Sequence, residues 1–299
     1  MSGQDWLAGE FEQHRPHLRG VAYRMLGSLC EAEDAVQEAW IRLSRTDTEE
    51  VRNLGGWLTT VVARVCLDML RTRKSRREEL FGEQGPPPAH GDTERQIDPE
   101  EETVLADSVG LALLVVLERL APAERLAFVL HDMFALPFDE IASILGRSSD
   151  SARQLASRAR RRVRGGSVTA NPDLRQQRTA VDAFLAAARD GNLEALLAVL
   201  HPDVVNRADR MIAPPNGREV HGASNVAKGA VAYSQMAQKG RAVPTMLALV
   251  DGSVGVLVAP GGRLVRVVKF EVRDGRIVTI DVIADPDRIR ELDVALLED

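Results

Sequence analysis

The sequence predicts a multidomain protein in which two all-α domains are followed by one α+β domain. Apolar residues recur at helical spacing over residues 8–75 and again from about Val104. After Pro244 the apolar period changes to two, which is typical of strands. With 299 residues and a 44% hydrophobic composition, the chain is long enough to form two or three domains with cores.

Domain limits are expected where the composition changes. We predict helical domains over residues 1–77 and 104–166, an α+β domain over 174–290, and a linker over 78–103 rich in Gly, Pro and acidic residues. Residues 78–107 hold ten acidic residues and one basic residue.

Turn residues predict the finer organisation. The glycines of Asn53–Gly56 interrupt the helical pattern, so we expect a loop there. Strands are expected at 246–250, 253–259, 264–272 and 276–283, joined by turns at Asp251-Gly252, Pro260–Gly262 and Asp274-Gly275.

Composition excludes several classes of protein. Cys30 and Cys66 are too few for a disulfide framework or a zinc site, and we interpret them as buried free thiols. No apolar run reaches the roughly 20 residues of a membrane span, and the amino terminus lacks an apolar signal core. We therefore expect a soluble, cytoplasmic protein with no metal and no cofactor.

The most informative segment is Arg147–Arg164, which holds seven arginines and one aspartate although the whole chain carries a formal charge of −6. Gly146 permits a sharp turn, and Ser148 can cap the helix that follows. This pattern predicts the second helix of a helix-turn-helix. A solvated arginine-rich helix is the alternative, but the turn and the shortage of acidic partners on the helix favour DNA binding.

One face of this helix is apolar, with Ala152, Leu155, Ala159 and Val163, and we expect it to be buried. Arginine and glutamine on the other face can pair with guanine and adenine edges, and the last arginines suit phosphates. Residues expected to bind DNA here are Ser151, Arg153, Gln154, Ser157, Arg158, Arg161 and Arg162.

Three motifs, in this order, resemble the extracytoplasmic-function (ECF) group of bacterial sigma factors. Ser28–Leu43 (SLCEAEDAVQEAWIRL) resembles the core-binding helix, and Trp57–Arg71 (WLTTVVARVCLDMLR) resembles the promoter-melting helix. Leu120–Arg125 (LAPAER), together with Phe138–Arg164, resembles the second DNA-binding domain. The resemblance covers roughly residues 8–165.

This resemblance implies two partners, RNA polymerase core and promoter DNA. The residues that it assigns to the beta-prime clamp of the polymerase are Glu33, Asp34, Gln37 and Glu38. Those expected to hold the start-proximal DNA element are Asn53, Trp57, Arg64, Asp68, Arg71 and Arg73. Trp57 is either a base-stacking residue or a core residue, and the acidic linker either threads the RNA exit channel or is a plain spacer.

Residues Ala180–Val205 resemble the opening of SnoaL-like domains of the nuclear-transport-factor-2 (NTF2) superfamily, which predicts a cone with a curved antiparallel sheet. Asp209, His221 and Asp281 are candidates to line a pocket in this cone, whereas His201, beside a proline, is interpreted as structural. Catalysis needs two such groups to converge, so we expect no catalytic residues and a regulatory domain.

The sequence thus predicts an alternative sigma factor that directs promoter-specific initiation and is regulated in cis by its C-terminal domain. No membrane and no separate anti-sigma factor are expected as partners. Two alternatives remain: a helix-turn-helix regulator that acts without core polymerase, and a SnoaL-like enzyme fused to a DNA-binding module.

Overall fold

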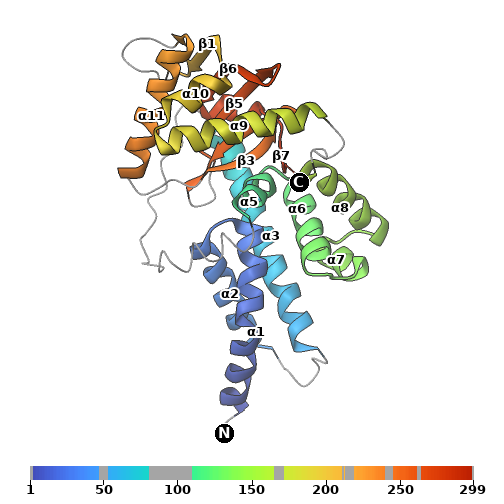
Figure 1. Cartoon of the computed structure of the whole chain (residues 1–299). Helices are drawn as coiled ribbons and strands as arrows, with labels where there is room; N and C mark the ends of the chain where they lie inside the picture. The colour runs from blue at the N-terminus through green and yellow to red at the C-terminus, as the bar shows by residue number, and fades with distance from the viewer. Residues whose placement is uncertain are drawn as a thin grey trace. The chain divides into compact units, whose positions relative to one another are not determined.

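The computed structural model describes residues 3–46, 53–80, 110–164, 172–210, 212, 219–239, 245–260 and 264–297 (Figure 1). The chain forms two compact units. The N-terminal unit comprises Met1–Gly110 and Leu117–Arg162, and the C-terminal unit comprises Leu111–Val116 and Val163–Asp299. Within the described ranges, no helix has both the length and the hydropathy that crossing a bilayer requires.

The N-terminal unit begins with α1 (Gly3–Leu26) and α2 (Leu29–Leu43). Gly27, at φ +76°, ends α1, and the Ser28 Oγ caps α2 by accepting the Glu31 N–H at 3.4 Å. Apolar side chains repeat at helical spacing and are buried between the helices. The buried residues include Phe11, Leu18, Val21, Met25, Leu26, Ala32, Val36, Ala39 and Leu43.

The third helix, α3 (Leu54–Leu80), begins earlier than the sequence predicts. The expectation of a loop over Asn53–Gly56 is wrong, because the Asn53 Oδ1 accepts the Gly56 N–H at 3.0 Å and caps the helix there. The glycines therefore occupy its first turn. At its other end α3 extends three residues into the segment predicted as linker, and residues 81–103 of that segment lie outside the described residues.

In the part of the chain that the structure describes, α3 is followed by α5 (Leu111–Glu118), α6 (Pro122–Phe128) and a π-helical turn, η2 (Val129–Met133). After these come α7 (Phe138–Leu145) and α8 (Ser149–Val163). Gly146 stands between them in the left-handed region at φ 64° and ends α7. The predicted helix-turn-helix is therefore present.

The C-terminal unit places two long helices and one short helix on one face of a seven-stranded sheet (Figure 1). The helices are α9 (Pro172–Asp190), α10 (Leu193–Val199) and α11 (Ala223–Lys239), and a short α12 (Pro286–Glu291) follows the last long strand. The strands are β1 (Leu200–Ala208), β2 (Glu219–His221), β3 (Thr245–Val250), β4 (Ser253–Val258), β5 (Arg266–Arg273), β6 (Arg276–Ile283) and β7 (Val294–Ala295).

The α+β prediction is confirmed, with one correction to the sheet. Its strand order is β2-β1-β6-β5-β4-β3-β7, and β1 runs parallel to β6, so the sheet is mixed rather than wholly antiparallel. β1 and β6 are neighbours in the sheet although β2, α11, β3, β4 and β5 lie between them along the chain. Two of the three expected turns are confirmed, since both residues of Asp251-Gly252 and of Asp274-Gly275 have positive φ. The third expected turn, Pro260–Gly262, lies outside the described residues apart from Pro260.

Strand pairing decides which side chains face the helices. Phe270 and Ile280 are partners on the covered face, where Phe270 lies edge-on to Phe184 of α9 at 5.7 Å between ring centroids. Because side chains alternate along a strand, Thr279 and Asp281 lie on the opposite face. Polar groups of β1 and β6 therefore share the face that α9–α11 leave uncovered.

We predict that Gly255→Ala destabilises the C-terminal unit. A Cβ at this position would lie 2.9 Å from the Val250 Cγ2 and 3.0 Å from the Val268 carbonyl oxygen, and the backbone neighbour cannot move aside cheaply. Overpacking of this kind lowers the free energy of unfolding by about 1–3 kcal/mol.

Gly229→Ala is the matched control, because a Cβ at this position of α11 would meet nothing within 4 Å. It should raise stability by about 0.5–1 kcal/mol, since alanine favours helix more than glycine does. Denaturant unfolding followed by circular dichroism measures both variants. Equal stability of the two would contradict the argument from close packing.

Candidate nucleic-acid interface

The second helix of the helix-turn-helix, α8, is capped as the sequence predicts. The Ser148 Oγ accepts the Ser151 N–H at 3.2 Å, and the hydroxyl of Ser149 donates to Asp139 in α7. The four positions predicted to be buried, Ala152, Leu155, Ala159 and Val163, are all 5% exposed or less. The orientation of α8 about its own axis is thereby confirmed.

Three residues lie along the side of α8 opposite this buried stripe. Gln154, Ser157 and Arg161 are exposed and are spaced three and four residues apart, so they form one ridge. Arg161 makes no ion pair or hydrogen bond to another residue in the described part of the chain. This ridge is the part of α8 that can approach a base edge without first breaking a contact.

The arginines on the flanks of this ridge are held by acidic residues. The Arg162 Nη1 donates to the Glu124 Oε2 at 2.6 Å, and the Arg158 Nε lies 3.8 Å from the other oxygen of the same carboxylate. On the other flank the Arg160 Nε donates to Asp132 at 2.7 Å, and this hydrogen bond raises the pKa of Arg160.

Arg153, nearer the start of α8, has two partners of its own. Its Nη1 donates to Asp150 at 2.9 Å, and its guanidinium lies over the Phe138 ring at 5.3 Å from the centroid. Both contacts are exposed, so solvent and salt weaken them. Arg153 is therefore held less firmly than Arg162, whose partner Glu124 is buried.

Arg125, next in sequence to Glu124, is buried with 2% of its surface exposed. Its Nε donates to the carbonyl oxygen of Arg24 in the last turn of α1 at 3.1 Å. Burial lowers the pKa of Arg125 to about 10, against the opposing effect of Glu118. Two consecutive residues of α6 thus bind two different parts of the N-terminal unit, one of which is the helix-turn-helix.

The residues predicted to hold start-proximal DNA divide between two sides of α3. Asn53, Trp57, Arg64, Asp68 and Arg71 follow one another at spacings of four, seven, four and three residues, which places them on one face. Trp57 is half-buried, and the others are exposed. The Arg71 Nη1 lies 3.8 Å from the Asp68 Oδ1, so the face carries a weak internal ion pair.

Arg73 is on the opposite side of α3. It is half-buried, it pairs with Glu31 in the first turn of α2, and its Nη1 approaches the Leu26 carbonyl oxygen at 3.5 Å. The structure therefore does not bring Arg73 together with the Trp57–Arg71 face.

The residues predicted to bind core polymerase are also not equivalent. Asp34 and Gln37 are exposed on α2, and Glu38 beside them pairs with Arg42 at 3.0 Å. Glu33 turns toward α1, where it lies 3.0 Å from Arg15 and 3.3 Å from Arg19. The exposed side of α2 is therefore centred on Asp34 and Gln37.

Comparisons with known proteins agree with these helices. A family model described as Sigma-70 region 2 matches residues 11–76, and one described as Sigma-70, region 4 matches residues 110–163. The ECF RNA polymerase sigma factor SigJ of Mycobacterium tuberculosis is 40% identical over 289 residues, covering 93% of this chain and 92% of the relative. The chain belongs to the ECF sigma factors.

Two further matches span nearly the whole chain. The probable ECF RNA polymerase sigma factor SigI of M. tuberculosis is 36% identical over 295 residues, or 98% of each chain. The crystal structure of SigJ aligns at 36% identity with a TM-score of 0.45, over 94% of this chain and 98% of the solved chain.

Family membership fixes the general activity. Sigma factors bind RNA polymerase core and promoter DNA, so this protein is an alternative sigma factor that directs transcription. Sigma factors are not enzymes, and the reading of the chain as a SnoaL-like enzyme is set aside. The contacts that each residue makes with DNA or polymerase stay predictions.

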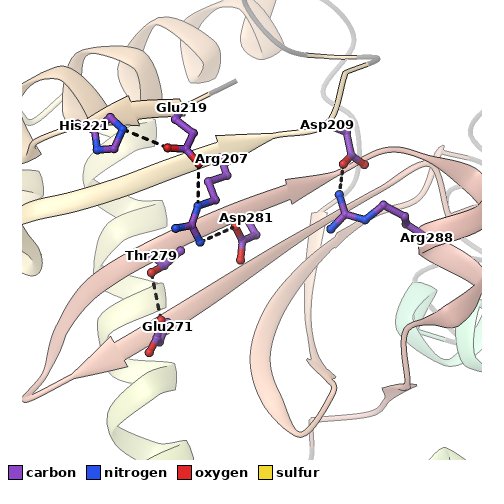
Figure 2. Close-up of polar contacts among 8 residues, drawn as sticks. All are labelled: Arg207, Asp209, Glu219, His221, Glu271, Thr279, Asp281 and Arg288. Atoms are coloured by element: carbon purple, nitrogen blue, oxygen red, sulfur yellow. Dashed lines mark hydrogen bonds and ion pairs between the residues drawn. The ribbon is translucent and has the colours of Figure 1, made fainter. Parts of the chain in front are cut away.

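The C-terminal unit of this sigma factor carries a polar network on the uncovered face of its sheet (Figure 2). Arg207 of β1 lies between Glu219 at 3.2 Å and Asp281 at 4.0 Å. His221 is 66% exposed and approaches Glu219 at 3.2 Å. Two of the predicted pocket residues, His221 and Asp281, are therefore linked only through other residues on an open surface.

Asp209, the third predicted pocket residue, has a separate environment (Figure 2). Its Oδ2 accepts the N–H groups of Ala284 and Asp285 at 2.9 Å each, and its Oδ1 pairs with Arg288. Burial acts to raise the pKa of Asp209, but the two backbone hydrogen bonds and the Arg288 charge outweigh it, so the pKa is lowered.

His201, interpreted as structural, accepts the Asp203 N–H at its Nδ1, 3.2 Å away. The thiol prediction is confirmed for Cys66, whose burial raises its pKa to about 12, whereas Cys30 is half-buried. The sequence did not single out Glu124, Asp132 or Arg125. Only the tertiary structure brings these residues to the interface, although an acid–arginine pair inside the Leu120–Arg125 motif was a visible signal.

We predict that Asp209→Asn lowers the free energy of unfolding at pH 7 by about 1.5–3 kcal/mol, because hydrogen bonds to a charged group are lost. In the folded protein the pKa of Asp209 is lowered from its ordinary value of 3.8, so the contribution is complete above that pH and is lost as pH falls through the folded value. The difference in free energy of unfolding between wild type and variant should be constant from pH 7 to 5 and should narrow below pH 3.8.

Asp203→Asn, at an exposed carboxylate of β1, which ends just before Asp209, is the control and should change stability little. Urea unfolding at pH 7, 5 and 3.5 measures all three proteins. A gap that widens toward low pH would be inconsistent with a lowered pKa at Asp209.

Proposed function

We propose that this sigma factor binds core RNA polymerase through α2, reads a start-proximal element with α3 and an upstream element with α8, and is regulated in cis by its C-terminal unit. The observation that carries the proposal is α8, an arginine-rich helix oriented by its buried stripe so that one polar ridge faces outward. The assignments of α2 to core polymerase and of α3 to the start-proximal element likewise rest on an exposed polar face of each helix.

Upstream reading is supported by the residue types on the ridge. Gln154 suits an adenine edge and Arg161 a guanine edge, because each can form two hydrogen bonds in the major groove. Ser151 and the flanking arginines Arg153, Arg158 and Arg162 suit phosphates and the outer edges of the site. The ion pairs of α8 favour Arg161 over Arg158 as a residue that reads bases.

Start-proximal binding is supported by the continuous face of α3. Arg64 and Arg71 supply cations for a single-strand backbone, and Trp57 offers an aromatic ring that is only half-buried. Asn53 occupies the cap at the end of the same face. Arg73 contributes to holding α3 on α2 through Glu31 and is proposed to act indirectly.

Core binding is supported by the acidic and amide groups of α2. Asp34, Gln37 and Glu38 form a compact polar area on the outer side of an amphipathic helix, and they suit a partner with basic and amide groups such as the beta-prime clamp. Glu33 is already paired with two arginines of α1 and is proposed to orient the helix.

Regulation in cis is supported by the way the chain is divided. The region 4 match runs from residue 110 to 163, and its first apolar residues, Leu111–Val116, group with the C-terminal unit. At its other end the carbonyl oxygen of Val163 accepts the N–H of Leu296 at 2.9 Å, within the same unit. The C-terminal unit therefore holds both ends of region 4, which suits regulation without a separate anti-sigma factor.

We predict that Gln154→Ala and Arg161→Ala each reduce the discrimination of the holoenzyme between its promoter and a scrambled upstream element by about 1–3 kcal/mol, or roughly five- to 150-fold. Competition binding of holoenzyme assembled from core polymerase and the full chain measures this ratio. Lys228→Ala, on α11, is the control and should leave the ratio unchanged. Equal loss of affinity for both DNAs would assign the two residues to phosphates.

We predict that Leu296→Pro changes promoter-directed run-off transcription by at least about threefold, because proline cannot donate the hydrogen bond that Leu296 makes to the Val163 carbonyl oxygen within the C-terminal unit. Leu296→Ala keeps the N–H and should transcribe like wild type. Pull-down of core polymerase is measured alongside. Unchanged transcription by Leu296→Pro would count against regulation in cis, and failure of wild type to bind core would favour a regulator that acts without polymerase.

A further inference from the structure

The arginines of α8 differ in how firmly they are held. Arg158 and Arg162 share one carboxylate, that of Glu124, and Arg160 is bonded to Asp132. Arg161 is the one arginine of this helix that lacks a partner within the described residues. The arginines of α8 therefore fall into two groups. Most are restrained by an acidic residue, and Arg161 is not.

Glu124 is the stronger of the two restraints, because its side chain is 7% exposed whereas that of Asp132 is 20% exposed. A carboxylate removed from water is costly unless cations compensate it, and its attraction to them is little screened by salt. Arg158 and Arg162 are four residues apart, so they lie one above the other and reach its two oxygens from the same flank of α8.

We propose that Glu124 is a positioning residue for promoter reading, which holds Arg158 and Arg162 on one flank of α8 so that the Gln154–Ser157–Arg161 ridge meets the bases first. Asp132 has the same role toward Arg160 on the other flank. The proposal deepens the upstream-reading function proposed above and rests on it.

The consequence concerns specificity rather than affinity. An unrestrained arginine follows the nearest phosphate on any sequence, and each such contact strengthens non-specific binding. A phosphate must compete with Glu124 to recruit Arg158 or Arg162, so this contribution is small on non-cognate DNA. When the ridge is correctly seated, the flanking arginines are already placed beside the backbone. Glu124 thus weakens binding to non-cognate sites, because its carboxylate competes with DNA phosphates for the same arginines.

The test compares full-length wild type with Glu124→Gln, each assembled into holoenzyme with core polymerase. A library with a randomised upstream element first defines the wild-type site, and binding to that site and to a scrambled one is then measured from 0.05 to about 0.3 M salt. Glutamine keeps the shape of the side chain but releases the two arginines. The scrambled site should be bound roughly five- to tenfold tighter near 0.1 M salt, with a salt slope steeper by about 0.9 for each phosphate gained.

The controls separate positioning from net charge and from folding. Glu140→Gln removes an exposed carboxylate from α7, makes the same change in net charge and should leave the slope close to wild type. The double variant Glu124→Gln, Arg162→Gln should lose most of the extra slope. Thermal unfolding of each variant is recorded, because a purely structural Glu124 would weaken binding to both sites and steepen neither slope.

The outcomes are distinguishable. A Glu124→Gln holoenzyme that behaves like Glu140→Gln, or that loses affinity for both DNAs, overturns the positioning role while the proposed function stands. A wild-type holoenzyme that selects no upstream sequence overturns the proposed function and this inference together. Tighter binding to scrambled DNA with a steeper slope, reversed in the double variant, supports the proposal.

Discussion

The N-terminal unit depends on one buried cation, the guanidinium of Arg125. Taking a charge out of water costs several kcal/mol, and arginine cannot escape this cost by losing its proton at physiological pH. The charge is tolerated because the Arg24 carbonyl oxygen accepts its hydrogen bond and because Glu118 and Glu31 lie near it. These groups come from separate helices, so the charge of Arg125 is compensated only when those helices pack together.

Helix α6 also contains Glu124, the residue that precedes Arg125. Glu124 and Arg125 are consecutive, yet one binds the arginines of α8 and the other binds the end of α1. A short helix of seven residues therefore contacts α8 and contributes to the core of the same unit. Because Glu124 and Arg125 carry opposite charges at adjacent positions, one turn of helix can bind arginines through one residue and oxygen atoms through the other.

Local chemistry made the simpler parts of this structure predictable. Asp-Gly pairs predict turns because glycine adopts positive φ freely. Ser148 predicts a helix cap because its hydroxyl satisfies an otherwise unpaired N–H. Strand β1 was missed because His201-Pro202 resembles a turn and its partner β6 is distant and parallel. Helix α11 was missed because Gly229 and small residues weaken its pattern. The division of the α8 arginines depends on Glu124 and Asp132, which only tertiary packing brings near.

The C-terminal unit is discontinuous in sequence, since it takes Leu111–Val116 and resumes at Val163. This has a consequence for synthesis on the ribosome. At about 5–20 residues per second, the strands that complete the unit follow the helix-turn-helix by roughly ten seconds. During that interval a nascent chain holds α8 before the strands with which Val163 is grouped have been made. The length of this interval is set by translation speed.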